Sequence, residues 1–276
     1  MPINGFILLA GLCLAVILFV LLYTRIENFF VFYPQKTLES TPADWSLSHE
    51  TVTFDTLDRK KLHGWFFPGQ GSGPVLLFFH GNAGNMSHRL DNVKRLLDHG
   101  LRVLIFDYRG YGRSEGKPSE RGIYLDGAAA FDFLVNVKGI SPHDIVLFGR
   151  SLGAAVAIEV ALRRKARALI VESAFTSTRE MARSLFLFAP ISPLLPAHYH
   201  NVGKISRVRV PLMFIHGTDD DIVPYRMGRK LHETATAPKR FLSLEGAGHN
   251  DTYVVGGEMY FQALRDFIFG DAAPAR

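Results

Sequence analysis

The sequence lacks the residues that build several common kinds of site. Its 276 residues include a single cysteine, Cys13, which excludes an internal disulfide. It has no cysteine cluster and no H-E-x-x-H pattern, so a metal site is not expected. The 31 basic and 26 acidic residues give a net charge of only +5. No basic motif interleaved with aromatic residues is present, and nucleic acid is therefore not an expected partner.

Charged residues are also missing from one long stretch near the N-terminus. Residues 3–23 are dominated by Ile, Leu, Val, Ala and Phe, and as a helix they would reach roughly 30 Å, enough to cross a bilayer. A cleaved signal peptide is the alternative, but no basic segment precedes the stretch and no A-x-A pattern follows it. We expect an uncleaved single-pass anchor. Arg25 and Lys36 follow it and no basic residue precedes it, which favours a cytoplasmic catalytic domain.

Beyond a juxtamembrane linker, 24–49, short apolar segments alternate with helical patterns, without an internal repeat. The segments expected to be strands are 50–55, 62–68, 75–79, 103–106, 145–148, 168–171, 212–215 and 240–244. The segments expected to be helices are 90–99, 123–137, 152–163, 225–234 and 259–268. This alternation predicts an α/β fold over 50–270, with a mostly parallel, doubly wound sheet of about eight strands whose first two strands form an antiparallel pair.

The most informative motif is Gly149-Arg150-Ser151-Leu152-Gly153. It follows an apolar run that indicates a buried strand, and it precedes a run of small residues that indicates the start of a helix. This context is typical of a nucleophile elbow, in which a sharp strand-to-helix turn exposes a serine hydroxyl. The two glycines let strand and helix approach closely. Ser151 is therefore the candidate nucleophile.

A serine nucleophile needs a base, usually a histidine that a carboxylate holds in one tautomer. In α/β-hydrolases the chain order is Ser, acid, His. The strand expected at 212–215 is followed by a turn that contains Asp219, Asp220 and Asp221. The last expected strand is followed by a short glycine-rich loop that contains His249.

From about residue 50 onward the chain resembles the α/β-hydrolase superfamily. It is most similar to small membrane-anchored serine hydrolases of the bud-emergence (BEM-type) and mammalian α/β-hydrolase-domain subfamilies, which include depalmitoylase-like enzymes. The motifs that carry the resemblance are Phe79-His80-Gly81-Asn82-Ala83-Gly84-Asn85, Asp107-Tyr108-Arg109-Gly110-Tyr111-Gly112-Arg113-Ser114, the elbow, His216-Gly217-Thr218 through Val223-Pro224, and Gly248-His249-Asn250-Asp251.

The resemblance assigns the remaining roles. In these relatives the acid stands four residues before the proline of the fourth motif, which selects Asp220 over its neighbours. The backbone N–H groups of Asn82 and Leu152 are implied as the oxyanion hole. His80 is expected to be a structural, hydrogen-bonded histidine. Asp107 and Arg109 are expected to pair and brace the loop beside the site.

The segment 181–200 interrupts the alternation of strands and helices. Met181, Leu185 and Phe188 recur at helical spacing, and prolines follow them. One interpretation is a helix packed on the core, and the other is a small cap, about 176–204, over the active site. We favour the cap and expect these three side chains to bind substrate.

The function expected from these features is a serine hydrolase that cleaves carboxylic esters or thioesters through an acyl-enzyme. The anchor and the apolar cap favour a small-molecule or lipid-like acyl substrate. The reaction needs no cofactor, and none is expected. A serine peptidase or amidase is an alternative because the same triad cleaves amides, and a catalytically inactive membrane-bound scaffold is another. The sequence does not indicate an oligomeric state.

Overall fold

The protein is described here by a computed structural model that covers residues 6–7, 9–11, 14, 18, 28–69, 73–184, 192 and 198–270. The chain divides into two compact units, Met1–Tyr33 and Pro34–Arg276. Within the described residues, no helix is both long enough and apolar enough to cross a membrane. Most of the anchor expected at 3–23 lies outside the described residues.

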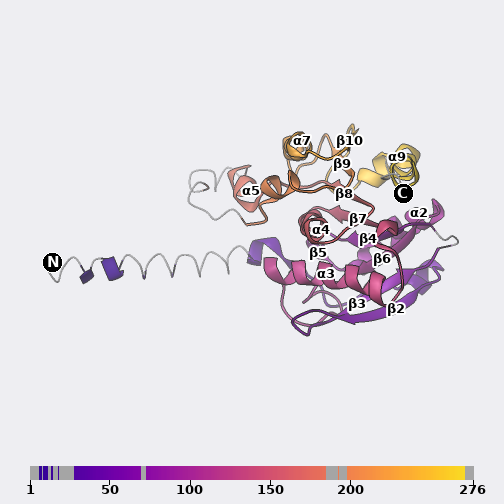
Figure 1. Cartoon of the computed structure of the whole chain (residues 1–276), viewed down its shortest axis with the longest axis horizontal. Coiled ribbons are helices and arrows are strands. Elements are labelled where there is room, and N and C mark those ends of the chain that lie inside the picture. Colours follow the sequence, from indigo (N-terminus) through magenta and orange to yellow (C-terminus); the bar gives the residue numbers. More distant parts are fainter. Residues whose placement is uncertain are drawn as a thin grey trace. The chain divides into compact units, whose positions relative to one another are not determined.

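An eight-stranded sheet forms the centre of the second unit, in the order β10-β9-β8-β7-β4-β6-β3-β2 (Figure 1). The strands are Glu50–Asp55 (β2), Lys61–Phe67 (β3), Val75–Phe79 (β4), Arg102–Phe106 (β6), Ile145–Arg150 (β7), Ala168–Glu172 (β8), Leu212–Gly217 (β9) and Lys239–Leu244 (β10). Strand β3 runs antiparallel to β2 and β6, and the pairings from β6 through β10 are parallel. The predicted mostly parallel α/β sheet is confirmed. Two short strands, Tyr33–Pro34 (β1) and Ala83–Gly84 (β5), form a separate sheet.

Helices cover both faces of the sheet, because its central strands are apolar on both sides. The longer helices are Leu90–Asp98 (α2), Glu120–Asn136 (α3), Leu152–Arg163 (α4), Tyr225–Thr234 (α7) and Gly257–Phe269 (α9). The shorter ones are Pro42–Trp45 (η1), Met86–Arg89 (η2), Pro142–Asp144 (η3), Thr178–Ser184 (α5), Asn201–Ile205 (α6) and Thr252–Val255 (α8). Phe78 and Phe148 share one buried cluster with side chains of α2 and α9. Phe79, the residue after Phe78, faces the other way and lies against α3 at Gly127.

The segment expected to form the cap leaves the sheet after β8 and returns through α6. Its two ends are joined at a neck, where the Thr178 N–H donates to the His198 carbonyl at 3.1 Å and the Val202 N–H donates to the Thr176 carbonyl at 3.1 Å. Met181 lies in α5 and is partly exposed, whereas Leu185 and Phe188 lie outside the described residues. The neck fixes where the segment starts and ends.

Candidate active site

Ser151 occupies a strained turn between β7 and α4. Its φ of 54° and ψ of −118° lie in a region that non-glycine residues rarely adopt. The turn requires both flanking glycines. A Cβ on Gly149 would lie 2.4 Å from the Gly153 carbonyl oxygen, and a Cβ on Gly153 would lie 2.0 Å from the Phe79 carbonyl oxygen. The sequence therefore forces Ser151 to the N-terminus of α4, where the helix dipole favours negative charge.

His249 reaches Ser151 from the loop after β10. Its Nε2 lies 3.0 Å from Ser151 Oγ, and the two residues keep only 7% and 9% of their surfaces exposed. Asp251 shapes this loop, because its carboxylate accepts a hydrogen bond from the Gly248 N–H at 2.7 Å. The glycine-rich loop that the sequence indicated brings the imidazole within hydrogen-bond reach of the candidate nucleophile.

Asp220 completes a continuous hydrogen-bonded chain. Its Oδ2 lies 2.8 Å from His249 Nδ1, and its Oδ1 accepts the Val223 N–H at 2.7 Å. Burial alone would raise the pKa of Asp220, but hydrogen bonds from His216 and His249 hold the pKa well below its usual range. Asp219 and Asp221 are exposed. The structure thus brings Ser151, His249 and Asp220 together, and it leaves the neighbouring aspartates outside this arrangement.

A second histidine, which the sequence interpretation did not assign, contacts the same carboxylate. His216 ends β9, is 1% exposed, and places its Nε2 3.2 Å from Asp220 Oδ2 and 2.9 Å from the Val223 carbonyl oxygen. Both neighbours are acceptors, so Nε2 carries the hydrogen. On the other side, α7 is packed so closely that a Cβ on Gly228 would lie 2.2 Å from His216 Nδ1. The only signal in the sequence was the position of His216 at the end of the strand before the aspartates.

Arg150, the residue before Ser151 in the elbow motif, connects the nucleophile strand to the histidine loop. Its Nη2 donates to the His249 carbonyl at 2.7 Å, and its Nε lies 3.3 Å from Glu172 Oε1. Glu172 is fully buried and also accepts hydrogen bonds from Thr252 Oγ1 at 2.7 Å and Tyr260 OH at 2.6 Å. This buried ion pair connects β7, β8 and the segment after His249. It was not predicted, because neither spacing nor composition marks it.

The loop after β4 lies directly against the nucleophile. A Cβ on Gly81 would be 3.6 Å from Ser151 Cβ, so the next peptide, that of Asn82, lies beside the elbow. Two tyrosines fix the loop: Tyr108 OH donates to the His80 carbonyl at 3.0 Å, and Tyr111 OH donates to the Asn82 carbonyl at 2.8 Å. This is the loop expected to supply one oxyanion donor, and Leu152, the other expected donor, begins α4.

The environment of His80 does not suit a second catalytic base. It is fully buried, its Nδ1 lies 2.7 Å from the Gly81 carbonyl oxygen, and burial lowers the pKa of its imidazole to about 3. Its Nε2 lies 3.6 Å from Asp107. These contacts agree with the structural histidine that the sequence predicted.

The predicted pairing of Asp107 with Arg109 is wrong. Arg109 Nε lies 2.9 Å from Asp126 Oδ1 in α3, and its Nη1 lies 2.7 Å from Asp58. Asp107 instead accepts the Met86 N–H at 2.8 Å. The reason is that Asp126 is fully buried and its charge needs a partner, which pulls the Arg109 side chain toward α3.

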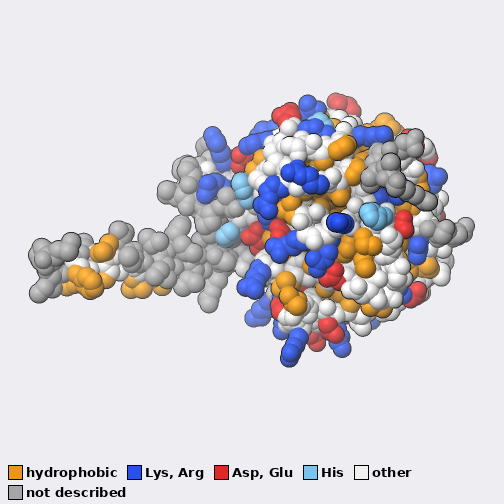
Figure 2. Space-filling model, in the orientation of Figure 1, with side chains coloured by type: hydrophobic (Ala, Val, Ile, Leu, Met, Phe, Trp, Pro, Cys, Tyr) orange, Lys and Arg blue, Asp and Glu red, His pale blue; other side chains and the backbone are white. Residues whose placement is uncertain are grey.

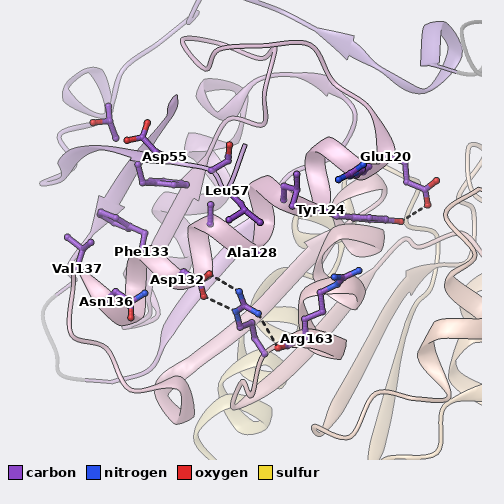
Figure 3. Close-up of a pocket in the computed structure, with 17 residues that line it drawn as sticks. Asp55, Leu57, Glu120, Tyr124, Ala128, Asp132, Phe133, Asn136, Val137 and Arg163 are labelled. Carbon is purple, nitrogen blue, oxygen red and sulfur yellow. Dashed lines mark hydrogen bonds and ion pairs between the residues drawn. The ribbon is translucent and has the colours of Figure 1, made fainter. Parts of the chain in front are cut away.

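A groove of about 890 Å³ lies away from these residues, between β2 and α3 (Figure 3). Phe133 and Ala128 are among the apolar residues that line it, and the ion-paired Asp132 and Arg164 line it as well. The lining includes no residue of the Ser151–His249–Asp220 chain. On the face that Figure 2 shows, Lys and Arg side chains are dispersed among acidic and hydrophobic ones.

Comparisons with known proteins show the family to which this chain belongs. A family model described as serine aminopeptidase, S33, matches residues 72–201. An uncharacterized protein of Mycobacterium tuberculosis is 41% identical over 219 residues, which make up 79% of this chain and 78% of that protein. Protein bem46 of Schizosaccharomyces pombe is 34% identical over 249 residues, 86% of this chain and 82% of bem46. An esterase of Pyrococcus furiosus has the same fold, with a TM-score of 0.69 at 24% identity over 87% of this chain and 97% of the esterase. The chain therefore belongs to the α/β-hydrolase superfamily, as a bem46-like member.

Proposed function

We propose that the protein is a serine hydrolase that cleaves carboxylic esters or thioesters through an acyl-enzyme. The observation that carries this proposal is the unbroken hydrogen-bonded chain from Ser151 Oγ through His249 to Asp220, with distances of 3.0 and 2.8 Å. Such a chain gives a serine hydroxyl the base that it needs to act as a nucleophile.

In the proposed reaction, Ser151 Oγ attacks the substrate carbonyl carbon while its proton moves to His249 Nε2. Asp220 stabilises the imidazolium that forms and keeps the ring oriented. The backbone N–H groups of Asn82 and Leu152 donate to the oxyanion of the tetrahedral intermediate. The intermediate collapses, and His249 gives its proton to the departing alcohol or thiol. His249 then takes a proton from a water molecule, whose oxygen attacks the acyl-enzyme carbonyl. The second intermediate collapses, His249 returns the proton to Ser151 Oγ, and the acid is released.

Labelling with a fluorophosphonate probe tests this proposal, because such probes react only with activated serines. The full-length protein should be labelled, and Ser151→Ala should abolish labelling. Ser206→Ala, which removes a surface hydroxyl at the end of α6, is the matched control and should be labelled like the wild type. Labelling that survives in Ser151→Ala, or its absence in the wild type, would reject the proposal; absence in the wild type would favour an inactive scaffold.

We further propose that the substrates are lipid-like and that residues 3–23 hold the enzyme at a membrane, with the catalytic domain on the cytoplasmic side. Support comes from the uncharged apolar stretch in the sequence and from the partly exposed Met181 in α5. With Leu185 and Phe188, Met181 is proposed to line an acyl pocket. A variant that begins at Lys36 should fractionate as soluble and keep activity on short-chain esters, while the full chain should need detergent. A full chain that stays in the aqueous fraction would contradict the anchor.

An amidase or peptidase activity is a second candidate, because the matching family model is described as a serine aminopeptidase. The same nucleophile can attack an amide, but the leaving amine is poorer and must be protonated. Acyl p-nitroanilides and acyl p-nitrophenyl esters with the same acyl chain separate the two activities. If the protein is an esterase, its kcat/KM should be much larger for the ester than for the anilide. The ratio should exceed the intrinsic difference in reactivity between the two substrates.

A further inference from the structure

Arg89, at the end of η2, carries a positive charge without an acidic partner. Its Nη2 donates to the Ala83 carbonyl at 2.7 Å, and its Nε is buried without a hydrogen-bond acceptor. Among the described residues, no carboxylate lies within 4.0 Å of this guanidinium. By contrast, the buried arginines Arg150 and Arg109 both have carboxylate partners. A guanidinium has five N–H donors, and most of those of Arg89 remain available.

The surroundings of Arg89 do little to compensate its positive charge. Burial, and then the nearby charge of Arg150, lower the pKa of Arg89 to about 10, so the side chain stays charged at neutral pH. Asp107 contributes some attraction without forming an ion pair with Arg89, and burial raises the pKa of its carboxyl to about 7. The protein therefore provides little compensation for a partly buried cation, and such a cation is stabilised by an anion that can hydrogen-bond to it.

The position of Arg89 relates it to the proposed chemistry. The carbonyl that it holds belongs to Ala83, the residue directly after Asn82, whose loop lies against Ser151. Arg150, which donates to the His249 carbonyl, and Tyr253, whose ring centre is 6.0 Å from the Arg150 guanidinium, are near enough for their charges to act on that of Arg89. Arg89 thus contacts the loop after β4 that lies against Ser151, and its charge is close to that of the arginine that holds the His249 carbonyl.

We propose that Arg89 binds an anionic group of the substrate, a carboxylate or a phosphate located a few bonds from the scissile carbonyl. The preferred substrates are then negatively charged esters or thioesters. This inference rests on the proposed function and narrows its substrate class. The anion belongs either to the acyl part or to the leaving alcohol, and the test includes one pair of substrates for each case.

The test compares esters that differ only in the anion. The first pair is p-nitrophenyl valerate and mono-p-nitrophenyl glutarate, and the second is a monoacylglycerol and the corresponding acylglycerol 3-phosphate. The readout is the ratio of kcat/KM for the anionic over the neutral ester within each pair. In Arg89→Gln this ratio should fall on the order of 10- to 100-fold for the pair that carries the recognised anion, which is the effect of losing one charged hydrogen bond.

Two further variants isolate the role of the guanidinium. Arg229→Gln, at an exposed residue of α7 that pairs with Glu233, removes the same net charge and should leave both ratios at the wild-type value. Arg89→Lys keeps the charge without the planar fork and should retain part of the preference. If Arg89 only supported the Ala83 carbonyl, Arg89→Gln would lower activity on both members of a pair together and leave the ratio unchanged.

The outcomes separate this inference from the proposed function. If fluorophosphonate labels Ser151 but wild-type and Arg89→Gln proteins show equal ratios for both pairs, the anion site is rejected and the hydrolase remains. If the wild type hydrolyses no ester and Ser151 is not labelled, the proposed function itself fails. A fall in the ratio for one pair, confined to Arg89 variants with unchanged melting temperatures, supports the anion site and identifies which part of the substrate carries the charge.

Discussion

Glu172→Gln is the substitution that tests most directly how the site is held together. Glu172 is fully buried and binds Arg150, Thr252 Oγ1 and Tyr260 OH. The glutamine has nearly the same shape, so the substitution removes the charge without leaving a cavity. Arg150 then keeps its charge at 4% exposure with no acidic partner.

The expected cost follows from this burial. Removing one partner of a buried ion pair typically destabilises a protein by about 3–5 kcal/mol, because the other charge stays desolvated and unpaired. For a unit of this size, 1 kcal/mol corresponds to roughly 2–4 °C in Tm. We therefore expect Tm to fall by about 6–20 °C. We also expect kcat to fall, because Arg150 no longer holds the His249 carbonyl in place.

A double-mutant cycle with Arg150→Met decides whether the pair is responsible. The double variant removes both charges, so it should be more stable than the sum of the single effects by about 2 kcal/mol or more. Its activity should stay low, since the hydrogen bond to His249 is also lost. Urea unfolding followed by circular dichroism measures stability, and ester hydrolysis measures activity. A Glu172→Gln protein within about 1 kcal/mol of the wild type, or single effects that simply add, would refute the reasoning.

Three other substitutions have defined outcomes. Ser151→Ala should lower ester turnover by several powers of ten while circular dichroism shows the fold retained, because only the oxyanion donors and substrate binding remain. Asp220→Asn should cost on the order of 10⁴ in kcat by disturbing the tautomer of the base, and Asp219→Asn should cost far less; a larger loss for Asp219→Asn would mean that the acid is misassigned. Burial raises the pKa of Asp107 to about 7. Between about pH 4 and pH 7 the folded protein therefore keeps a proton that the unfolded chain has released. The contribution of Asp107 to the free energy of unfolding falls as pH rises through this range. The stability of Asp107→Asn relative to the wild type should therefore increase between pH 4 and 7 in urea unfolding, and a difference independent of pH would contradict the shift.

The sequence predicted the elements whose signal is local. The apolar runs at β4 and β9 and the small-residue helix α4 are recognisable from composition and period alone, and the two glycines around Ser151 mark the elbow. The predicted triad residues also follow strand ends, so the parallel sheet brings them to one edge.

Residues were missed where their contacts depend on turn geometry or on the pairing of elements. His216 meets Asp220 only because the turn after β9 folds back toward the strand end. Arg150 meets Glu172 because these two residues are direct partners in the pairing of β7 with β8. The Asp107–Arg109 prediction failed for a related reason: a buried carboxylate on α3, Asp126, competes for the arginine, and sequence spacing carries no information about it.

The neck at the base of the segment between α5 and α6 has a consequence for how this enzyme can change. The hydrogen bonds between Thr178 and His198 and between Val202 and Thr176 close the segment onto itself before it meets the sheet. A loop whose two ends already touch can be shortened, lengthened or exchanged while the strands that carry Ser151 and Asp220 keep their positions. Under the proposed function this segment contributes to selectivity while the strands hold the catalytic geometry, so grafting the segment of a relative between Thr178 and His198 should alter the first and leave the second in place.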